Sequence, residues 1–244
     1  MANLFRLTLV DFKYVVKTKE LWIALGIISI YTLGMFAFTL DSETSYTTEF
    51  FYQLIHDLLF YVLILLPAVT LSKEYTFKTT RILFTGPYPR RIILSSKFFS
   101  MLIFYALVSV VHRFSANSLL MYHERIFSMD VLLQNFVQTI VVYVIVGLFI
   151  CILAFFITLL TYSRMATMIT VMTVFIVEKY LRGFILFLFP QNYVKKFITH
   201  NPINIAAQGL QYSSITIVDS FILLMTTLFI GVGTVILLFK KEIQ

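Results

Sequence analysis

The stretch VLLQNFVQTIVVYVIVGLFICILAFFITLLT, residues 131–161, contains no Asp, Glu, Lys or Arg. An α-helix needs roughly 20 apolar residues to cross the hydrocarbon of a bilayer, so this stretch is more than long enough. The whole chain has a similar character, because 59% of its 244 residues are hydrophobic and only 13% are charged. Its mean hydropathy is +0.90. Soluble domains carry about 25% charged residues, so this composition indicates a membrane protein.

Five further apolar runs accompany this stretch. In hydrocarbon every backbone polar group needs a partner within the protein, which favours helices. We therefore expect an all-α polytopic membrane protein with six transmembrane helices, which form a single domain over residues 21–244. The predicted spans cover residues 21–40, 54–71, 98–120, 131–161, 165–189 and 218–239.

The distribution of Lys and Arg predicts the orientation. Most of the nineteen lie in the first 20 residues, in the connection 72–97, in the turn at 163–164 and in the C-terminal tail. The opposite connections hold only Arg125, Lys195 and Lys196. Positive residues next to spans favour the cytoplasmic side. We therefore expect a multi-pass protein of the cytoplasmic (plasma) membrane, with both termini and residues 72–97 on its cytoplasmic side. The net charge of +7 is explained in this way, and nucleic-acid binding is not supported.

Two segments outside the spans have their own patterns. Residues 1–20 alternate apolar and basic side chains at roughly helical spacing, which predicts an amphipathic helix in the inner interface. The alternative is an extension of the first span. Residues 190–217 mix apolar residues with the breakers Pro190, Asn201-Pro202 and Gly209. This mixture predicts short re-entrant helices in the outer leaflet, protected by surrounding protein, before the last span.

No recognisable catalytic or nucleotide-binding motif is present. The sequence has no Gly-Lys pair, so it lacks a phosphate-binding P-loop, and it has neither H-E-x-x-H nor G-x-S-x-G. The four histidines lack metal-ligand spacing, and Cys151 is the single cysteine. We expect no enzyme activity, no metal and no cofactor on this chain. Energy for any transport would come from a partner or from an ion gradient.

The connection 72–97 is the longest segment predicted to lie in the cytoplasm, and it is rich in basic residues. Residues 75–84 lack Gly and Pro and predict a short helix parallel to the membrane, and the turn at 86–89 follows. The alternative interpretation of residues 72–97 is a basic loop on the inner side that merely follows the orientation rule. The order of its residues resembles the coupling region of type-two ABC transporter permeases, on Glu74, Thr79, Thr80, Leu83, Pro87, Arg90 and Lys97. Ser96 stands where that family often has Gly, and Thr79-Thr80 stands where it commonly has a Gly-Thr or Gly-Ser pair.

A second resemblance to the same family lies at residues 198–204, where Asn201 and Pro202 match its Asn-Pro segment before the last span. The resemblance implies six helices per subunit and a dimer with a second permease, either the same or homologous. It also implies two copies of a cytoplasmic ATPase subunit, which bind ATP and Mg and contact residues 72–97. Small permeases of this family export amphipathic or antimicrobial peptides, lipids or drugs, or confer self-immunity.

Charged residues also occur inside two predicted spans. His112 and Arg113 lie in the third, and Glu178, Lys179 and Arg182 lie in the fifth. Such groups usually pair or face a polar cavity. Arg113 and Glu178 have matched depths, about 20 Å from the inner face, which permits an ion pair; Glu178 with Arg182 at i,i+4 is the local alternative. These residues either line a translocation cavity or form a bridge between helices or at an interface.

Two other functions remain open from the sequence. An ion-coupled secondary transporter would use Glu178, Arg113 and His112 as a relay, although no internal repeat typical of many such folds is visible. A non-transporting membrane anchor or immunity protein would form a stable complex without substrate flux. Dependence of transport on ATP or on a proton gradient would separate these hypotheses.

Overall fold

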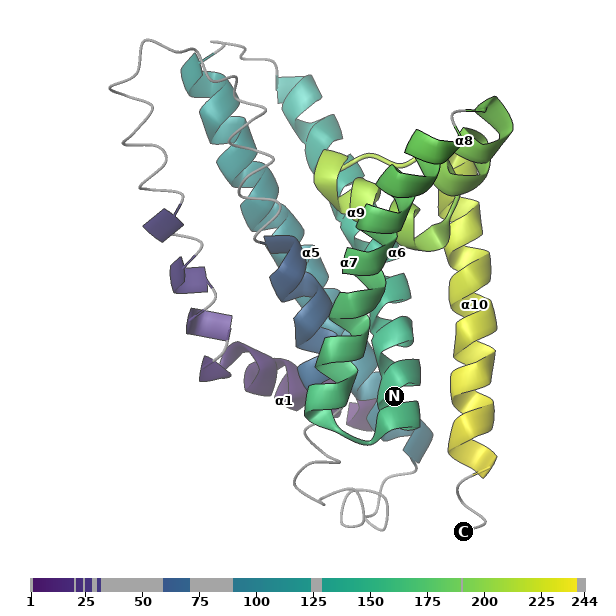
Figure 1. The fold of residues 1–244 in the computed structure, drawn as a ribbon. Helices are drawn as coiled ribbons and strands as arrows, with labels where there is room; N and C mark the ends of the chain where they lie inside the picture. The colour runs from purple at the N-terminus through teal and green to yellow at the C-terminus, as the bar shows by residue number, and fades with distance from the viewer. Residues whose placement is uncertain are drawn as a thin grey trace.

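The computed structural model of the chain describes residues 2–19, 21–23, 25–27, 30–31, 59–70, 90–123, 129–189 and 191–240. Every regular element within these ranges is a helix (Figure 1). The elements are α1 (Ala2–Val16), α5 (Arg90–His123), α6 (Met129–Thr161), α7 (Arg164–Leu188), α8 (Asn192–Thr199), α9 (Pro202–Tyr212) and α10 (Ile217–Lys240). A shorter apolar helix covers Leu59–Thr70.

Within the part of the chain that the structure describes, three helices are long and apolar enough to cross a membrane. They are Ile92–Phe114 within α5, Leu133–Thr161 within α6 and Ile217–Leu237 within α10. These segments agree with the third, fourth and sixth predicted spans, and they indicate a membrane protein. The count of six spans remains a prediction, because most of the first predicted span, residues 21–40, lies outside the described residues.

The fifth predicted span, residues 165–189, forms the continuous helix α7 over almost the same range. Ser163 caps its N-terminus, since the side chain accepts a hydrogen bond from the backbone N–H of Ala166 at 3.5 Å. The charges of Glu178, Lys179 and Arg182 leave α7 outside the group of helices that are apolar enough to span. Helix formation is therefore confirmed for this segment, and membrane crossing stays a prediction.

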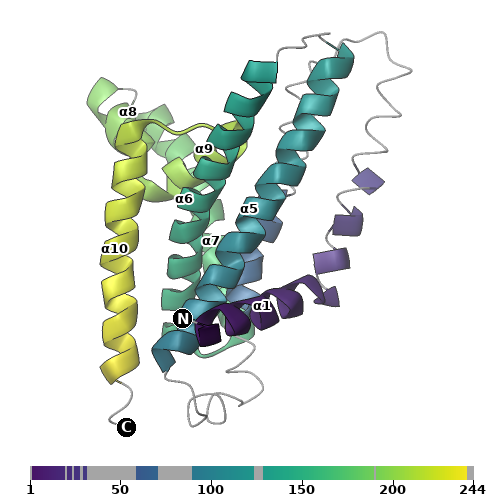
Figure 2. The same cartoon turned by 180° about the vertical axis from the view of Figure 1, so that it is seen from behind.

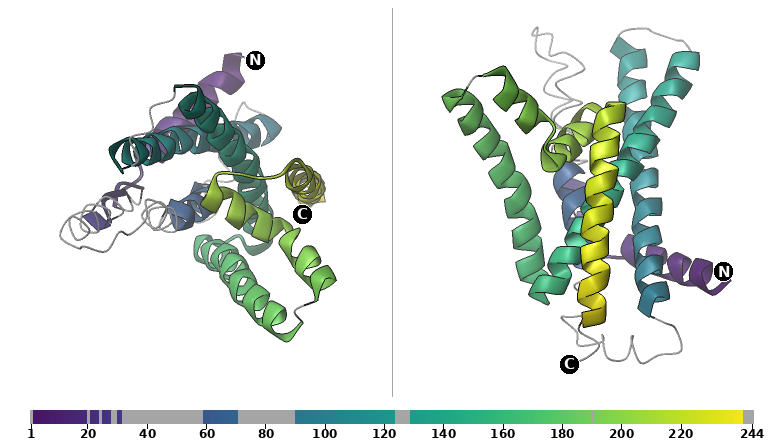
Figure 3. Two further views of the ribbon diagram at one scale, coloured as in Figure 1. Left: turned by 90° about the horizontal axis from the view of Figure 1, so that it is seen from above. Right: turned by 90° about the vertical axis from the view of Figure 1, so that its right-hand side faces the viewer.

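Helix α6 is the centre of the arrangement and contacts α5, α7, α9 and α10. Consecutive long helices, from α5 to α6 and from α6 to α7, run in opposite directions. Helix α1 lies across the N-terminal end of α5 (Figure 2). Helix α1 and the last turns of α10 lie at one end, whereas α8 and α9 lie at the other (Figure 3). Both ends of the described chain therefore lie on the same side, as the predicted topology requires. Which side is cytoplasmic remains a prediction.

The core contains the side chains of α6 that face α5 and the Leu59–Thr70 helix. The ring of Tyr105, on α5, is fully buried and packs on the backbone of Gly147, where an added Cβ would lie 2.6 Å from the ring carbon Cγ. The hydroxyl of Tyr105 donates a hydrogen bond of 2.6 Å to the carbonyl oxygen of Leu63. One side chain thus joins three helices, and only glycine at 147 leaves it room.

The outer surfaces of α7 and α10 are apolar rather than polar. Phe187 on α7 is 83% exposed, and Ile217 and Phe229 on α10 are 90% and 80% exposed. Monomeric soluble proteins rarely expose contiguous apolar patches of this kind. Lipid chains would cover such surfaces without cost, which agrees with the membrane assignment.

Two short helices, α8 and α9, occupy the predicted re-entrant segment 190–217. The Asn-Pro pair begins α9: the side chain of Asn201 accepts a hydrogen bond of 3.0 Å from the backbone N–H of Ile203, and Pro202 occupies the first turn. Both positions are favoured for these residue types. The presence of short helices here is confirmed, whereas their depth in a membrane remains a prediction.

Candidate functional site

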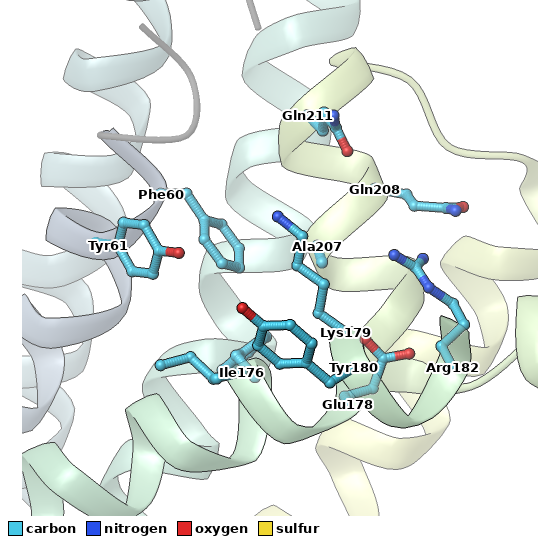
Figure 4. A pocket seen from close by; sticks show the side chains of 11 residues that line it. Phe60, Tyr61, Ile176, Glu178, Lys179, Tyr180, Arg182, Ala207, Gln208 and Gln211 are labelled. Carbon is cyan, nitrogen blue, oxygen red and sulfur yellow. The ribbon is translucent and has the colours of Figure 1, made fainter. Parts of the chain in front are cut away.

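A cavity of about 190 Å³ lies between the Leu59–Thr70 helix, α7 and α9 (Figure 4). It combines aromatic side chains with amides and charged groups. Its lining consists of Phe60, Tyr61, Phe175, Ile176, Glu178, Lys179, Tyr180, Arg182, Ala207, Gln208 and Gln211. It therefore contains all three of the charged residues that were predicted as site residues in the fifth span.

The sequence of α7 places Glu178 on the buried face of the helix. Thr167, Val171 and Phe175 precede it at intervals of one turn, and all four side chains are buried. Glu178 is only 9% exposed, and its Oε1 atom is buried without a hydrogen-bond partner in the described structure. A buried carboxylate oxygen without a donor is costly, so this position suits a group that binds a ligand or changes its proton occupancy.

Arg182 joins α7 to the two short helices. Its Nη1 donates a hydrogen bond to Oδ1 of Asn204, a residue of α9 that is 1% exposed. The amide nitrogen of Asn204 in turn donates to the carbonyl oxygens of Thr199 at 3.0 Å and Ile198 at 3.3 Å, at the end of α8. Because these groups are partnered, this network fixes α8 and α9 against the C-terminal half of α7.

Neither of the two ion pairs that the sequence permits for Glu178 is formed as a close contact, although the charge of Arg182 acts on Glu178. Within the described residues, no ion pair or hydrogen bond joins Glu178 to Arg113 or to Arg182. Arg113 instead has a buried Nε atom without a hydrogen-bond partner. Its neighbour His112 hydrogen-bonds through Nδ1 to the hydroxyl of Tyr143 on α6, at 2.7 Å. The structure thus brings His112 to α6 and separates it from the cavity-lining charges.

A second polar cluster lies where α1 crosses α5. The hydroxyl of Ser96 donates a hydrogen bond of 2.6 Å to Oδ2 of Asp11, and Nζ of Lys97 lies 3.6 Å from Oδ1 of the same carboxylate. Ser96 and Lys97 are 1% and 5% exposed. Lys97, predicted as a coupling residue, is therefore held against the N-terminal helix.

Of the other predicted coupling residues, only Arg90 lies within the described ranges. Glu74, Thr79, Thr80, Leu83 and Pro87 all lie outside the described residues. Arg90 is the first residue of α5, so the predicted coupling segment leads directly into that helix.

A third cluster ties the corner between α8 and α9 to α10. His200 Nδ1 hydrogen-bonds to Oδ1 of Asp219 at 2.9 Å. Thr216 donates to Oδ2 of the same carboxylate at 2.7 Å and accepts from its backbone N–H at 3.1 Å. This is a capping arrangement in which Asp takes the place of the usual Glu. The Thr-x-x-Asp spacing before an apolar run is a signal that sequence reasoning missed.

No known protein family and no curated protein sequence matches this chain. Within the described ranges there is no group of three or more His, Cys, Asp or Glu residues that could hold a metal ion. The cavity presents charged groups and amides, and the Asp11 cluster joins α1 to α5.

Proposed function

We propose that this chain is the membrane-spanning permease subunit of an ABC-type exporter of an amphipathic substrate, such as a peptide, a lipid or a drug-like molecule. The resemblance at residues 74–97 and 198–204 supports the proposal at the level of sequence. Two cytoplasmic ATPase subunits would bind ATP and Mg, and a second permease would complete the transport pathway. This chain would bind no cofactor and would perform no covalent chemistry.

The observation that carries the proposal is the attachment of α1 to the start of α5 through Asp11. The segment 72–97 is the proposed contact with the ATPase, and its last residues, Ser96 and Lys97, are the two partners of Asp11. A buried, charge-assisted contact resists separation better than an exposed one. A push on this segment would therefore move α1 and α5 together.

The mechanism that follows is mechanical. Closure of the ATPase subunits on ATP would displace residues 72–97, and α5 would transmit this movement to α6, which it contacts. At the opposite end, the Arg182–Asn204 network would hold α7, α8 and α9 as one body. Tyr105 of α5 is hydrogen-bonded to the Leu59–Thr70 helix through the carbonyl oxygen of Leu63, so movement of α5 would shift that helix against α7 and α9 and would change the cavity that lies between them.

The test is purification of the tagged chain from its native membranes in a mild detergent, followed by mass spectrometry of the proteins that copurify. We expect an ATPase in stoichiometric amount, and we expect Arg90→Glu to remove it without loss of membrane insertion. Lys195→Glu makes the same charge change on α8, at the other end of the molecule, and should retain the ATPase. Copurification that survives Arg90→Glu, or a wild-type chain isolated without any ATPase, would contradict the proposal.

An ion-coupled secondary transporter is the second candidate, and the buried, unpartnered Oε1 of Glu178 is the observation that favours it. A carboxylate that exchanges protons during transport is a common use of an acidic residue in a span. Transport that continues after ATP depletion but stops when the proton gradient is abolished would support this candidate. The reverse result would support the exporter.

A further inference from the structure

Two opposite charges in the cavity form no hydrogen bond or close ion pair within the described residues, although the charge of Arg182 acts on one of them, Glu178. Glu178 has a buried Oε1 atom without a hydrogen bond, and the next residue, Lys179, has no ion-pair or hydrogen-bond partner among the residues that the structure describes. The third charge, Arg182, is already engaged with Asn204. Figure 4 shows Glu178 between Lys179 and Arg182, below the amides of α9. The cavity thus offers one carboxylate and one ammonium group to a ligand.

The remaining walls are aromatic and open to the apolar surface of the molecule. Phe60 and Phe175 meet edge to face, with ring centroids 5.5 Å apart, and form the inner wall. Tyr61, Ile176 and Tyr180 line the other side and are 38%, 40% and 74% exposed. An apolar tail could therefore leave the cavity between the Leu59–Thr70 helix and α7, and it would meet the lipid that covers the outer face.

The size of the cavity selects a small polar group rather than a whole molecule. Pockets for drug-sized ligands measure roughly 300–1,000 Å³, whereas this cavity measures about 190 Å³. Glu178 lies 14 residues after Arg164, at the start of α7, which corresponds to about 20 Å along the helix axis. In the predicted topology this depth is within the hydrocarbon, where a polar group in transit needs such a site.

We propose that the cavity binds the zwitterionic head group of an amphiphile, with a primary ammonium on Glu178 and the adjacent anionic group on Lys179. A purely anionic group would approach the buried carboxylate and leave its oxygen unpartnered. A purely cationic group would meet Lys179 and Arg182. Only a group with both charges satisfies Glu178 and Lys179 together, and the amides of Gln208 and Gln211 can bind its remaining polar atoms. The assignment of this ligand as transport substrate rests on the proposed exporter function.

The experiment is native mass spectrometry of the purified chain in a non-ionic detergent with short-chain phospholipids. The probe is dihexanoyl-phosphatidylethanolamine, and the comparison lipids are dihexanoyl-phosphatidylglycerol, which is anionic, and dihexanoyl-phosphatidylcholine, whose quaternary ammonium cannot donate a hydrogen bond. We expect phosphatidylethanolamine to bind at least about tenfold more tightly than either comparison lipid. Only its head group can form charge-assisted hydrogen bonds with both Glu178 and Lys179. Free phosphoethanolamine in competition distinguishes the head group alone from the lipid.

Variants identify the site. Glu178→Gln and Lys179→Gln should each weaken binding of phosphatidylethanolamine about tenfold, while Lys195→Gln on the exposed α8 should leave it unchanged. Thermal unfolding of each variant shows whether it is folded, and Glu178→Asp provides a second test that keeps the charge. Equal binding of all three lipids, tighter binding of an amphipathic peptide than of lipid, or unchanged binding by folded Glu178→Gln would overturn the proposal. Because the chain is studied alone, these results do not depend on whether an ATPase copurifies.

Discussion

Substitution of Gly147 by alanine tests how closely α5 and α6 are packed. The added Cβ would lie 2.6, 2.7 and 3.0 Å from the Cγ, Cδ2 and Cδ1 atoms of Tyr105. Ordinary van der Waals contacts between carbon atoms are about 3.5–4.0 Å, so the ring must move. Its hydroxyl is bonded to the carbonyl oxygen of Leu63, and the ring is fully buried, so movement breaks that bond or displaces a helix.

The cost can be estimated from these two consequences. Overpacking of a well-filled core costs about 1–3 kcal/mol, and a buried carbonyl oxygen left without its donor costs about 1–3 kcal/mol more. We therefore expect Gly147→Ala to lower the free energy of unfolding by about 2–6 kcal/mol. Gly231 offers a matched control on α10, because a Cβ there would lie 3.7 Å from Cδ1 of Ile152, an ordinary contact.

The assay is thermal unfolding of both variants in the same detergent, with circular dichroism as the signal that monitors loss of helix. Gly147→Ala should unfold at a clearly lower temperature than the wild type, whereas Gly231→Ala should unfold close to it. The double variant Gly147→Ala with Tyr105→Ala should be less destabilised than the sum of the single variants, because the clash is absent. Equal stability of the two alanine variants, or additive effects in the double variant, would refute the reasoning.

Three further predictions concern the polar clusters that join the helices. Asp11→Asn removes the charge next to the buried Lys97 and should cost about 2–4 kcal/mol in unfolding free energy; faster proteolysis of the N-terminal helix would confirm that α1 has been released. Asn204→Leu leaves Arg182 without its acceptor and should cost about 2–4 kcal/mol, with increased hydrogen exchange in α8 and α9 as the measurement. Thr216→Ala removes the cap of α10 and should cost about 1 kcal/mol, seen as increased exchange in its first turn only.

The long apolar helices could be predicted closely because their signal is local. The predicted spans at 131–161 and 218–239 agree with apolar segments at Leu133–Thr161 and Ile217–Leu237. For the third span, prediction began at residue 98, but α5 begins at Arg90. The apolar segment itself begins at Ile92 and includes Lys97. Lys97 is buried and its Nζ lies 3.6 Å from Oδ1 of Asp11, so this one charge does not end the segment.

The contacts between helices could not be predicted in the same way. Arg113 and Glu178 have matched depths along their helices, and this alone suggested a pair. Depth fixes the position along a helix axis but says nothing about rotation around it, and the structure leaves these two groups unpaired. Likewise, nothing near Asp11 in the sequence indicates that its partner Ser96 lies 85 residues away. Tertiary partners of single polar residues require the helix packing itself.

The exposed apolar surface and the few polar contacts have a common physical explanation. In a membrane the lipid chains are as apolar as Leu or Phe, so burial of apolar side chains hardly favours one helix arrangement over another. Specific association must then come from close packing at small residues and from hydrogen bonds. Here Gly147 and Gly209 provide the close approaches, and Asp11 and Asn204 provide the bonds. A substitution at any of these positions should therefore lower the stability of the helix arrangement more than a substitution at an exposed side chain such as Phe229.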